Sequence, residues 1–287
     1  VEANGFTRAA ESLQMPKASV TTLIQQLEAR LGIKLLNRTT RHVSVTADGA
    51  AYYERCVRIL ADIDETEQLL GNVRRAPAGR LRVDVPAFAG RVLLGPALPD
   101  FFARYPDIRL ELGCTDRPID LLEEGVDCVV RGGALPDSTG YIGRRIGELE
   151  TVTCAAPAYL NRHGVPQTPA DLVGHKHINY FSSKTGRIFD FDFERDGERV
   201  AFPVDGFVAV NDSNAYLAIG LTGLGIMQVP RYAVREELAD GRLVRILPEW
   251  RSDPIPVHVM YPQNRHLSNK VRIFVDWVAE IFADLQP

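Results

Sequence analysis

The residue pattern of this chain changes abruptly at residues 74–79 (RRAPAG), and this change restricts the available folds more than any other feature. Before it, apolar residues recur at three- and four-residue steps, which is typical of helices with one buried face. After it, short apolar runs alternate with helical patterns, which predicts a parallel sheet with right-handed crossovers. A length of 287 residues also favours two domains over one. The expected fold class is therefore α+β multidomain.

The N-terminal part predicts two short helices and a hairpin. Thr7 is the expected N-cap of the first helix, and Pro16 fits the first turn of a second helix. This second helix is expected to end near Leu31, because Gly32 is a typical C-terminal stop. Residues 38–45 then predict a β-hairpin.

The second helix offers a face that suits the major groove of DNA, because its outward side chains are compact, polar and free of acid. They are Lys17, Ala18, Thr21, Thr22 and Gln25. Taken alone, this helix could equally be an ordinary amphipathic core helix. The basic hairpin that follows favours DNA, since residues 29–47 hold four Lys and Arg and no acid. We expect Arg38, Arg41 and His42 to meet phosphate or the minor groove.

Charge is distributed unevenly along the chain. Residues 1–80 carry 11 Lys and Arg against 9 Asp and Glu, whereas residues 81–287 carry 22 against 28. A basic head on an acidic body indicates a polyanion-binding module joined to another domain.

A longer helix is expected from an N-cap at Thr46 to about Val73. It has a heptad-like apolar seam, interrupted at Glu67, which favours pairing with a second copy of the chain. The seam consists of Tyr53, Cys56, Leu60, Ile63 and Leu70. Residues 74–79 follow as a linker.

Beyond the linker, the pattern predicts alternating strands and helices. The first part is expected to contain strands Leu81–Val85, Ile108–Gly113 and Val126–Val130, with helices Arg91–Arg104 and Ile119–Glu124. The second part is expected to contain a hairpin turning at Asp196-Gly197, helices Asn211–Thr222 and Tyr232–Ala239, and a strand Ile226–Val229. A strand Val257–Tyr261 and a helix Leu267–Leu285 are expected to close the chain.

Several phrases resemble the LysR-type transcriptional regulators. They are Ala9-Ala10-Glu11, Pro16 to Ile24, Leu27-Glu28-x-x-Leu31-Gly32, Thr46-x-x-Gly49, Arg131-Gly-Gly133 and Leu135-Pro-Asp-Ser138. The resemblance covers the whole chain. It implies a winged helix-turn-helix (1–47), a dimerising linker helix and hinge (48–79), and a two-lobed effector domain (80–287) similar to periplasmic binding proteins. Lobe I would comprise 80–154 and 257–287, and lobe II 155–256.

The resemblance also implies a function and partners. The function is ligand-responsive transcription regulation, with operator DNA, a small-molecule effector and further copies of the chain, up to a tetramer, as partners. RNA polymerase is a further candidate partner. The sequence departs from the family in two places. Relative to most members, we expect about a dozen residues at the start of the first helix to be missing, and Pro16 stands where many members have a Ser that caps the recognition helix.

The effector is expected at the carboxyl ends of the strands, between the two lobes. The residues placed there are Pro86, Ala87, Phe88, Arg131 and Gly132 from lobe I, with Phe181, Ser182, Asn211, Asp212, Ser213, Gly225 and Ile226 from lobe II. Arg131 is the main candidate, because a guanidinium can clamp a carboxylate with two hydrogen bonds. The alternative is a structural ion pair between Arg131 and Asp212 or Asp137.

Other chemistry finds little support in the sequence. The phrase from Gly220 to Gly225 precedes a strand, which is the wrong order for a dinucleotide site. The histidines lack metal-ligand spacing, and neither a nucleophile motif nor a cofactor loop is evident, so we expect no metal, no cofactor and no enzyme. The four separate cysteines and the lack of a long apolar run favour the cytosol over a membrane. The alternatives are a solute-binding protein, which the basic N-terminal module argues against, and an α/β enzyme, which would need a nucleophile or cofactor loop in residues 81–287, where none is evident. Cys154 is expected to pack near the crossover between the lobes, with a reactive thiol left open.

Overall fold

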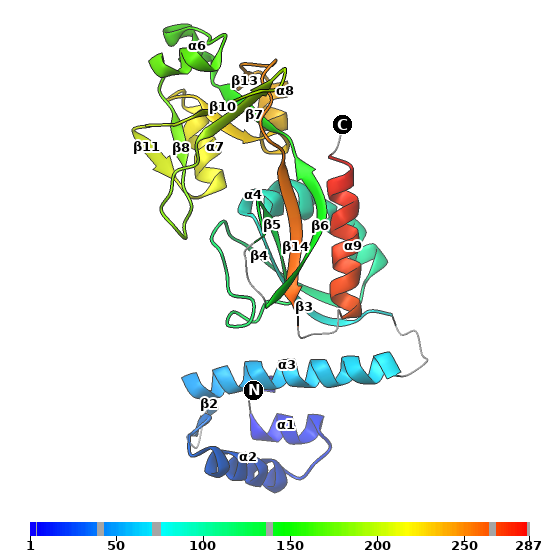
Figure 1. Ribbon diagram of the computed structural model, residues 1–287. Helices are drawn as coiled ribbons and strands as arrows, with labels where there is room; N and C mark the ends of the chain where they lie inside the picture. Colours follow the sequence, from blue (N-terminus) through cyan, green and yellow to red (C-terminus); the bar gives the residue numbers. More distant parts are fainter. Residues whose placement is uncertain (4, 39–42, 71–75, 136–139, 264–267, 286–287) are drawn as a thin grey trace. The chain divides into compact units, whose positions relative to one another are not determined.

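The computed structural model covers residues 1–287 and describes all of them except 4, 39–42, 71–75, 136–139, 264–267 and 286–287. The chain divides into two compact units, Val1–Arg75 and Ala76–Pro287. The first contains three helices and a small hairpin, and the second contains the larger sheets (Figure 1). Among the residues described, no helix has both the length and the apolar composition needed to cross a membrane.

The first unit opens with the two short helices that the pattern predicts. Helix α1 (Phe6–Ser12) starts directly after Gly5 and has no side-chain cap, so the expected N-cap at Thr7 is wrong. Helix α2 (Lys17–Leu31) follows Pro16 and ends at Gly32, where the left-handed φ of 70° confirms the predicted stop.

A hairpin and a long helix complete the first unit. Strands β1 (Leu36–Arg38) and β2 (Val43–Val45) are antiparallel. The Glu28 carboxylate of α2 accepts the backbone N–H groups of Leu35 and Leu36, at 2.9 and 3.0 Å. One side chain thus fixes the hairpin relative to α2.

Helix α3 (Ala47–Leu70) is joined tightly to the same hairpin. The Thr46 hydroxyl accepts the N–H of Gly49 at 2.9 Å, which confirms the predicted N-cap. The Thr46 N–H donates to the Leu35 carbonyl at 3.0 Å. A Cβ at Gly49 would lie 2.0 Å from that same carbonyl oxygen, so only glycine fits there.

The larger part of the second unit, lobe I, is built on one five-stranded sheet. Its order is β4 (Ile108–Cys114), β3 (Gly79–Val85), β5 (Cys128–Gly132), β14 (Ile255–Pro262) and β6 (Tyr141–Leu149). The first three strands are parallel as predicted. Strand β14 runs antiparallel to both its neighbours, so the complete sheet is mixed.

Helices cover one face of this sheet. Segments α4 (Ala87–Ala89), the π-turn Gly90–Leu94 and α5 (Gly95–Arg104) follow one another without a break, so this helical stretch begins before the expected Arg91. Phe101 packs on Trp277 of α9 (Asn269–Ala283), with ring centroids 4.8 Å apart. The expected helix Ile119–Glu124 is wrong, because Asp120 caps a single turn there and Gly125 then adopts a φ of 64°.

Lobe II contains three small sheets. They are β7 (Thr151–Ala155) between β12 (Met227–Pro230) and β13 (Val244–Arg245), the parallel pair β8 (Ile178–Tyr180) and β11 (Val208–Val210), and the hairpin β9 (Phe191–Arg195) and β10 (Glu198–Phe202). Its helices are α6 (Pro157–His163), α7 (Ser213–Leu221) and α8 (Arg235–Ala239), with 3-10 turns Pro169–Gly174 and Arg231–Val234. The hairpin turn at Asp196-Gly197 has positive φ at both residues, as this sequence predicts.

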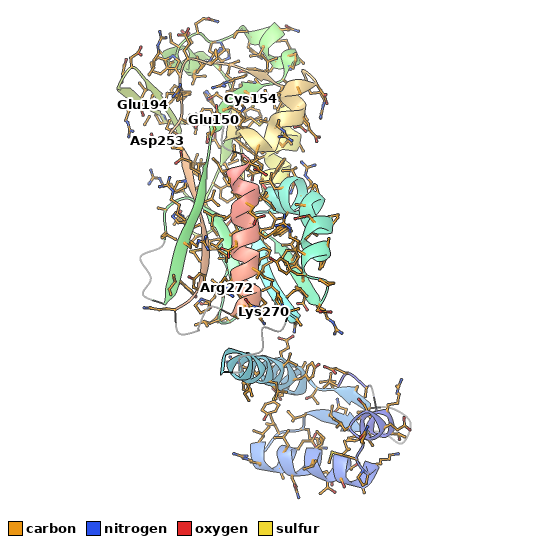
Figure 2. The ribbon with its side chains drawn as sticks, turned by 90° about the vertical axis from the view of Figure 1, so that its right-hand side faces the viewer. Glu150, Cys154, Glu194, Asp253, Lys270 and Arg272 are labelled. Atoms are coloured by element: carbon orange, nitrogen blue, oxygen red, sulfur yellow. The ribbon has the colours of Figure 1, made fainter. Side chains whose placement is uncertain are left out.

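The chain leaves the lobe I sheet after Leu149 and enters the lobe II sheet at Thr151, with Glu150 between them (Figure 2). This crossing lies four residues before the boundary expected from the sequence. Cys154 therefore belongs to the lobe II core, where it is fully buried. Burial raises the pKa of its thiol to about 12, which disfavours the thiolate form that reacts.

We predict that Gly49→Ala destabilises the first unit by about 1–3 kcal/mol, because the added methyl group meets a backbone carbonyl that cannot rotate away. Gly5→Ala is the matched control, since its Cβ would meet nothing within 4 Å. Urea unfolding followed by amide hydrogen exchange in α2 and α3 measures the difference. Equal stability of the two variants would contradict the close approach.

Candidate nucleic-acid interface and ligand site

The outward face of α2 has the geometry that the sequence predicts. Lys17, Ala18, Thr22 and Gln25 are exposed, and Thr21 is half-buried. The Thr21 hydroxyl donates to the Lys17 carbonyl at 3.0 Å, so it presents its lone pairs outward. This helix therefore has a polar, acid-free face at its N-terminal end.

The opposite side of α2 is covered only in part. Val20 is buried and Ile24 and Leu27 are half-buried, but Leu23 and Leu31 are exposed, although the apolar periodicity groups all five. The hairpin beside α2 carries the remaining predicted DNA contacts. Arg38 lies in β1, whereas Arg41 and His42 lie outside the described residues, so their roles stay predictions.

The expected seam on α3 exposes large apolar side chains. Leu60 is 60% exposed and Ile63 is 48% exposed, and Ile59 beside them is 57% exposed. Cys56 and Tyr53 are half-buried, and the Tyr53 hydroxyl donates to Glu2 at 2.7 Å within the same unit. The side chain of Leu70 is outside the part of the chain that the structure describes. Among the seam side chains that the structure describes, the exposed ones thus lie in the middle of α3.

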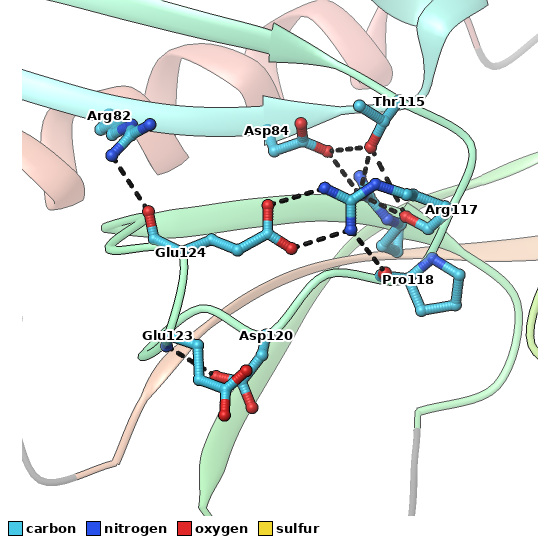
Figure 3. A network of polar contacts seen from close by, with 9 residues as sticks. Arg82, Asp84, Thr115, Arg117, Pro118, Asp120, Glu123 and Glu124 are labelled. Carbon is cyan, nitrogen blue, oxygen red and sulfur yellow. Dashed lines mark hydrogen bonds and ion pairs between the residues drawn. The ribbon is translucent and has the colours of Figure 1, made fainter. Parts of the chain in front are cut away.

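In the second unit, a polar network joins the carboxyl ends of β3, β4 and β5 (Figure 3). Arg131 forms an ion pair with Asp84, a carboxylate that is only 4% exposed. The Thr115 hydroxyl donates to the same carboxylate at 3.0 Å. Arg131 also donates to the backbone carbonyl of Arg117 at 3.2 Å. The guanidinium therefore holds the loop that follows β4.

This arrangement bears on the expected role of Arg131. The structural partner is Asp84 and not Asp212, while Asp137, the other alternative, lies outside the described residues. The guanidinium is already engaged by the Asp84 carboxylate, by the backbone carbonyls of Val130 and Arg117, and by the Thr115 hydroxyl. A ligand clamp at Arg131 stays a prediction, and it would require these contacts to be shared or exchanged.

The loop after β4 also carries Asp116, which the sequence analysis did not single out. Its two carboxylate oxygens accept different backbone N–H groups, that of Ala87 in lobe I at 3.0 Å and that of Ser213 in lobe II at 2.6 Å. Ala87 begins α4 and Ser213 begins α7. Asp116 thus joins the two lobes at the strand ends. Its position two residues after β4 marks it as a strand-end residue, but its two partners are distant in the sequence.

Several predicted effector residues gather around this point. Pro86, Ala87 and Ser213 are half-buried, and Asn211 and Asp212 are exposed. Asp212 caps α7 through the N–H of Ala215 at 2.7 Å. These residues follow the carboxyl ends of β3 and β11, which is where the sequence predicts the effector site.

Phe181, Ser182 and Gly132 also lie after or at strand ends. Phe181 donates its N–H to Val210 of β11 at 2.9 Å, so it and Ser182 lie beside the start of α7. Gly132 ends β5 next to Arg131 and pairs with Val257 of β14. None of these three is fully buried.

The remaining predicted residues lie elsewhere. Phe88 is 2% exposed and packs inside the lobe II core, edge-on to Tyr232. Ile226 is fully buried and, with Gly225, lies beside Lys176 and His177 at the opposite end of β8. The prediction for Gly225 and Ile226 fails because these two residues precede β12, whereas ligand sites of this kind lie after the carboxyl ends of strands. Within the described part of the chain, no cluster of three metal-ligating side chains occurs.

Comparisons with known proteins agree with this architecture. Residues 1–50 match the family model for the bacterial regulatory helix-turn-helix protein of the lysR family, and residues 74–283 match the LysR substrate binding domain. The chain is 42% identical to the regulator YhjC of Escherichia coli K12, over 99% of this chain and 94% of that protein. It is 41% identical to a transcriptional repressor of Pseudomonas aeruginosa, over 99% and 89% of the two chains.

A solved structure of similar fold is CrgA, a LysR-type transcriptional regulator from Neisseria meningitidis. The TM-score is 0.64 at 32% identity, covering 98% of this chain and 95% of that one. Fold and comparisons together define a helix-turn-helix regulator with a separate effector-binding domain, and not an enzyme. The chain belongs to the LysR family of transcriptional regulators.

We predict that Arg131→Ala destabilises the second unit by about 3 kcal/mol, because it leaves the buried Asp84 without its counter-charge. Arg117→Ala is the control, since that guanidinium pairs with Glu124 at the surface, where water screens the pair, and its loss is expected to change stability little. Guanidinium unfolding of both variants measures the contrast. Equal, small losses would show that the Arg131 pair is not structural.

Proposed function

We propose that this regulator binds promoter DNA through the polar face of α2 and the basic hairpin, and that a small molecule bound between the lobes alters that binding. The observation that carries the proposal is the exposed, acid-free face at the start of α2. The family relation supports it, since the matched models are a DNA-binding module and a ligand-binding domain. Its place of action would be the cytosol, where promoter DNA is found.

Two kinds of DNA contact are proposed. Lys17, Ala18, Thr21, Thr22 and Gln25 would meet base edges in the major groove. Arg38, Arg41 and His42 would contact phosphate or the minor groove, which positions the protein without reading sequence. Because Glu28 fixes the hairpin on α2, the two sets would engage DNA together.

We expect Arg41→Ala to weaken binding to all DNA sequences alike and to lower the salt slope by about one unit. Lys17→Ala and Thr22→Ala should instead change which bases are preferred, by about 1–3 kcal/mol at the affected position. Fluorescence anisotropy with promoter and scrambled DNA at several salt concentrations measures both effects. Arg109→Ala, which removes an exposed arginine of the second unit, is the control. An unchanged affinity and salt slope for Arg41→Ala would contradict the hairpin assignment.

Self-association is proposed through the α3 seam, namely Tyr53, Cys56, Leu60 and Ile63. Their exposed apolar area is what a helix pair would cover, and two copies would present two recognition helices to adjacent half-sites. A tetramer would then pair two such dimers.

We expect Leu60→Asp to weaken this dimer at least about 100-fold, because it places an unpaired charge in an apolar seam. Ala51→Asp adds the same charge on the opposite side of α3 and should leave the dimer intact. Light scattering and sedimentation at micromolar concentration, without DNA, compare the two. A monomeric unmodified protein would contradict the seam.

The effector is proposed to bind near the start of α4 and α7. Pro86, Ala87, Arg131, Gly132, Phe181, Ser182, Asn211, Asp212 and Ser213 are the candidates that the strand ends support, while Phe88, Gly225 and Ile226 would need core rearrangement. A ligand can shift DNA binding only through unequal affinity for two lobe arrangements. Where DNA affinity stays constant, regulation would act through DNA bending or contact with RNA polymerase.

A further inference from the structure

We propose that Asp116 is an inter-lobe latch, a residue that positions the two lobes by accepting one backbone N–H from each. The evidence is the pair of hydrogen bonds described above, to Ala87 at 3.0 Å and to Ser213 at 2.6 Å. A carboxylate suits this task because both oxygens accept and neither donates. The latch belongs to the effector site of the proposed function, and its regulatory meaning rests on that function.

The surroundings of Asp116 favour this role over a surface ion pair. In the part of the chain that the structure describes, no Lys or Arg forms a salt bridge with it. Its neighbours are tyrosines. Burial of Tyr180 and Tyr232 raises the pKa of each hydroxyl most, and the negative charge of Asp116 raises it further. Hydrogen bonds from two backbone N–H groups, one in each lobe, therefore hold this carboxylate, together with a side-chain hydrogen bond from Tyr180.

The loop that carries Asp116 is itself held in place. Arg131 donates to the Thr115 hydroxyl at 3.5 Å and to the Arg117 carbonyl at 3.2 Å, on either side of Asp116. The ion pair with the buried Asp84 fixes this guanidinium. A continuous set of polar contacts thus runs from the lobe I sheet to the first residue of α7.

A ligand that carries a carboxylate would compete with Asp116 for the same two N–H groups. Binding of such a ligand would release the latch, and the lobes would remain joined by Phe88, which packs in the lobe II core. Ligand binding and lobe arrangement would then be coupled through one side chain. A ligand without an acidic group would leave the latch closed.

The test uses the full chain with the variants Asp116→Ala and Asp116→Asn and with formate as the probe. Asp116→Ala should lower the melting temperature of the second unit by about 5 °C or more, since two charge-assisted hydrogen bonds are lost. Formate at tens of millimolar should restore much of this loss, with chloride at equal ionic strength as the reference. Asp116→Asn keeps the side-chain volume but only one acceptor, so it should melt lower and resist rescue by formate.

Two control variants separate the latch from ordinary capping. Asp120→Ala removes a carboxylate that accepts two N–H groups within lobe I, and Asp212→Ala removes the cap of α7 within lobe II. Neither should respond to formate beyond the unmodified protein. Amide hydrogen exchange should rise at both Ala87 and Ser213 in Asp116→Ala and Asp116→Asn, but not in Asp120→Ala.

The proposal is overturned if Asp116→Ala melts within about 1 °C of the unmodified protein, or if formate stabilises all variants equally. It is also overturned if Ser213 keeps its protection in both Asp116 variants. Should Asp116→Ala fail to fold, Asp116→Asn and its exchange rates decide the outcome. Absence of promoter binding by the unmodified protein would reject the proposed function and leave these results unaffected.

Discussion

The ion pair between Arg131 and the buried Asp84 is the contact on which the ligand-binding half of the molecule depends. It places a guanidinium at the carboxyl ends of three neighbouring strands, and that guanidinium orients the loop after β4. Through Asp116 the same loop reaches the start of α7 in the other lobe. This single ion pair therefore positions the loop at the carboxyl end of the lobe I sheet, and that loop contacts lobe II.

In the helix-turn-helix unit, too, a few contacts fix the positions of several elements. Glu28 holds the hairpin against α2, and Thr46 and Gly49 hold α3 against the backbone of Leu35. These residues belong to the phrases by which the sequence resembles its family. Their roles are geometric, because they fix the positions of the hairpin and the helices, whereas in the proposed function the exposed face of α2 would read the DNA sequence.

Local features of the fold were predictable from the sequence, since each depends on nearby residues. The left-handed Gly32, the cap at Thr46 and the hairpin turn at Asp196-Gly197 are examples. The expected helix after Pro118 was wrong because the periodicity could not show that Asp120 and Gly125 limit it to one turn. Asp116 was missed for a different reason. Its two partners lie 29 and 97 residues away, and no short-range pattern reports such distances.

The pairing of β6 with β14 determines how the two lobes are connected. These strands are antiparallel neighbours, and Leu149 lies opposite Ile255 at the very place where the chain departs into lobe II and returns from it. Lobe II is therefore topologically a long insertion at the tip of a β-hairpin. Joining Leu149 to Ile255 by a short turn would leave the lobe I sheet unbroken, so lobe I has the connectivity of a complete sheet domain without the residues of lobe II.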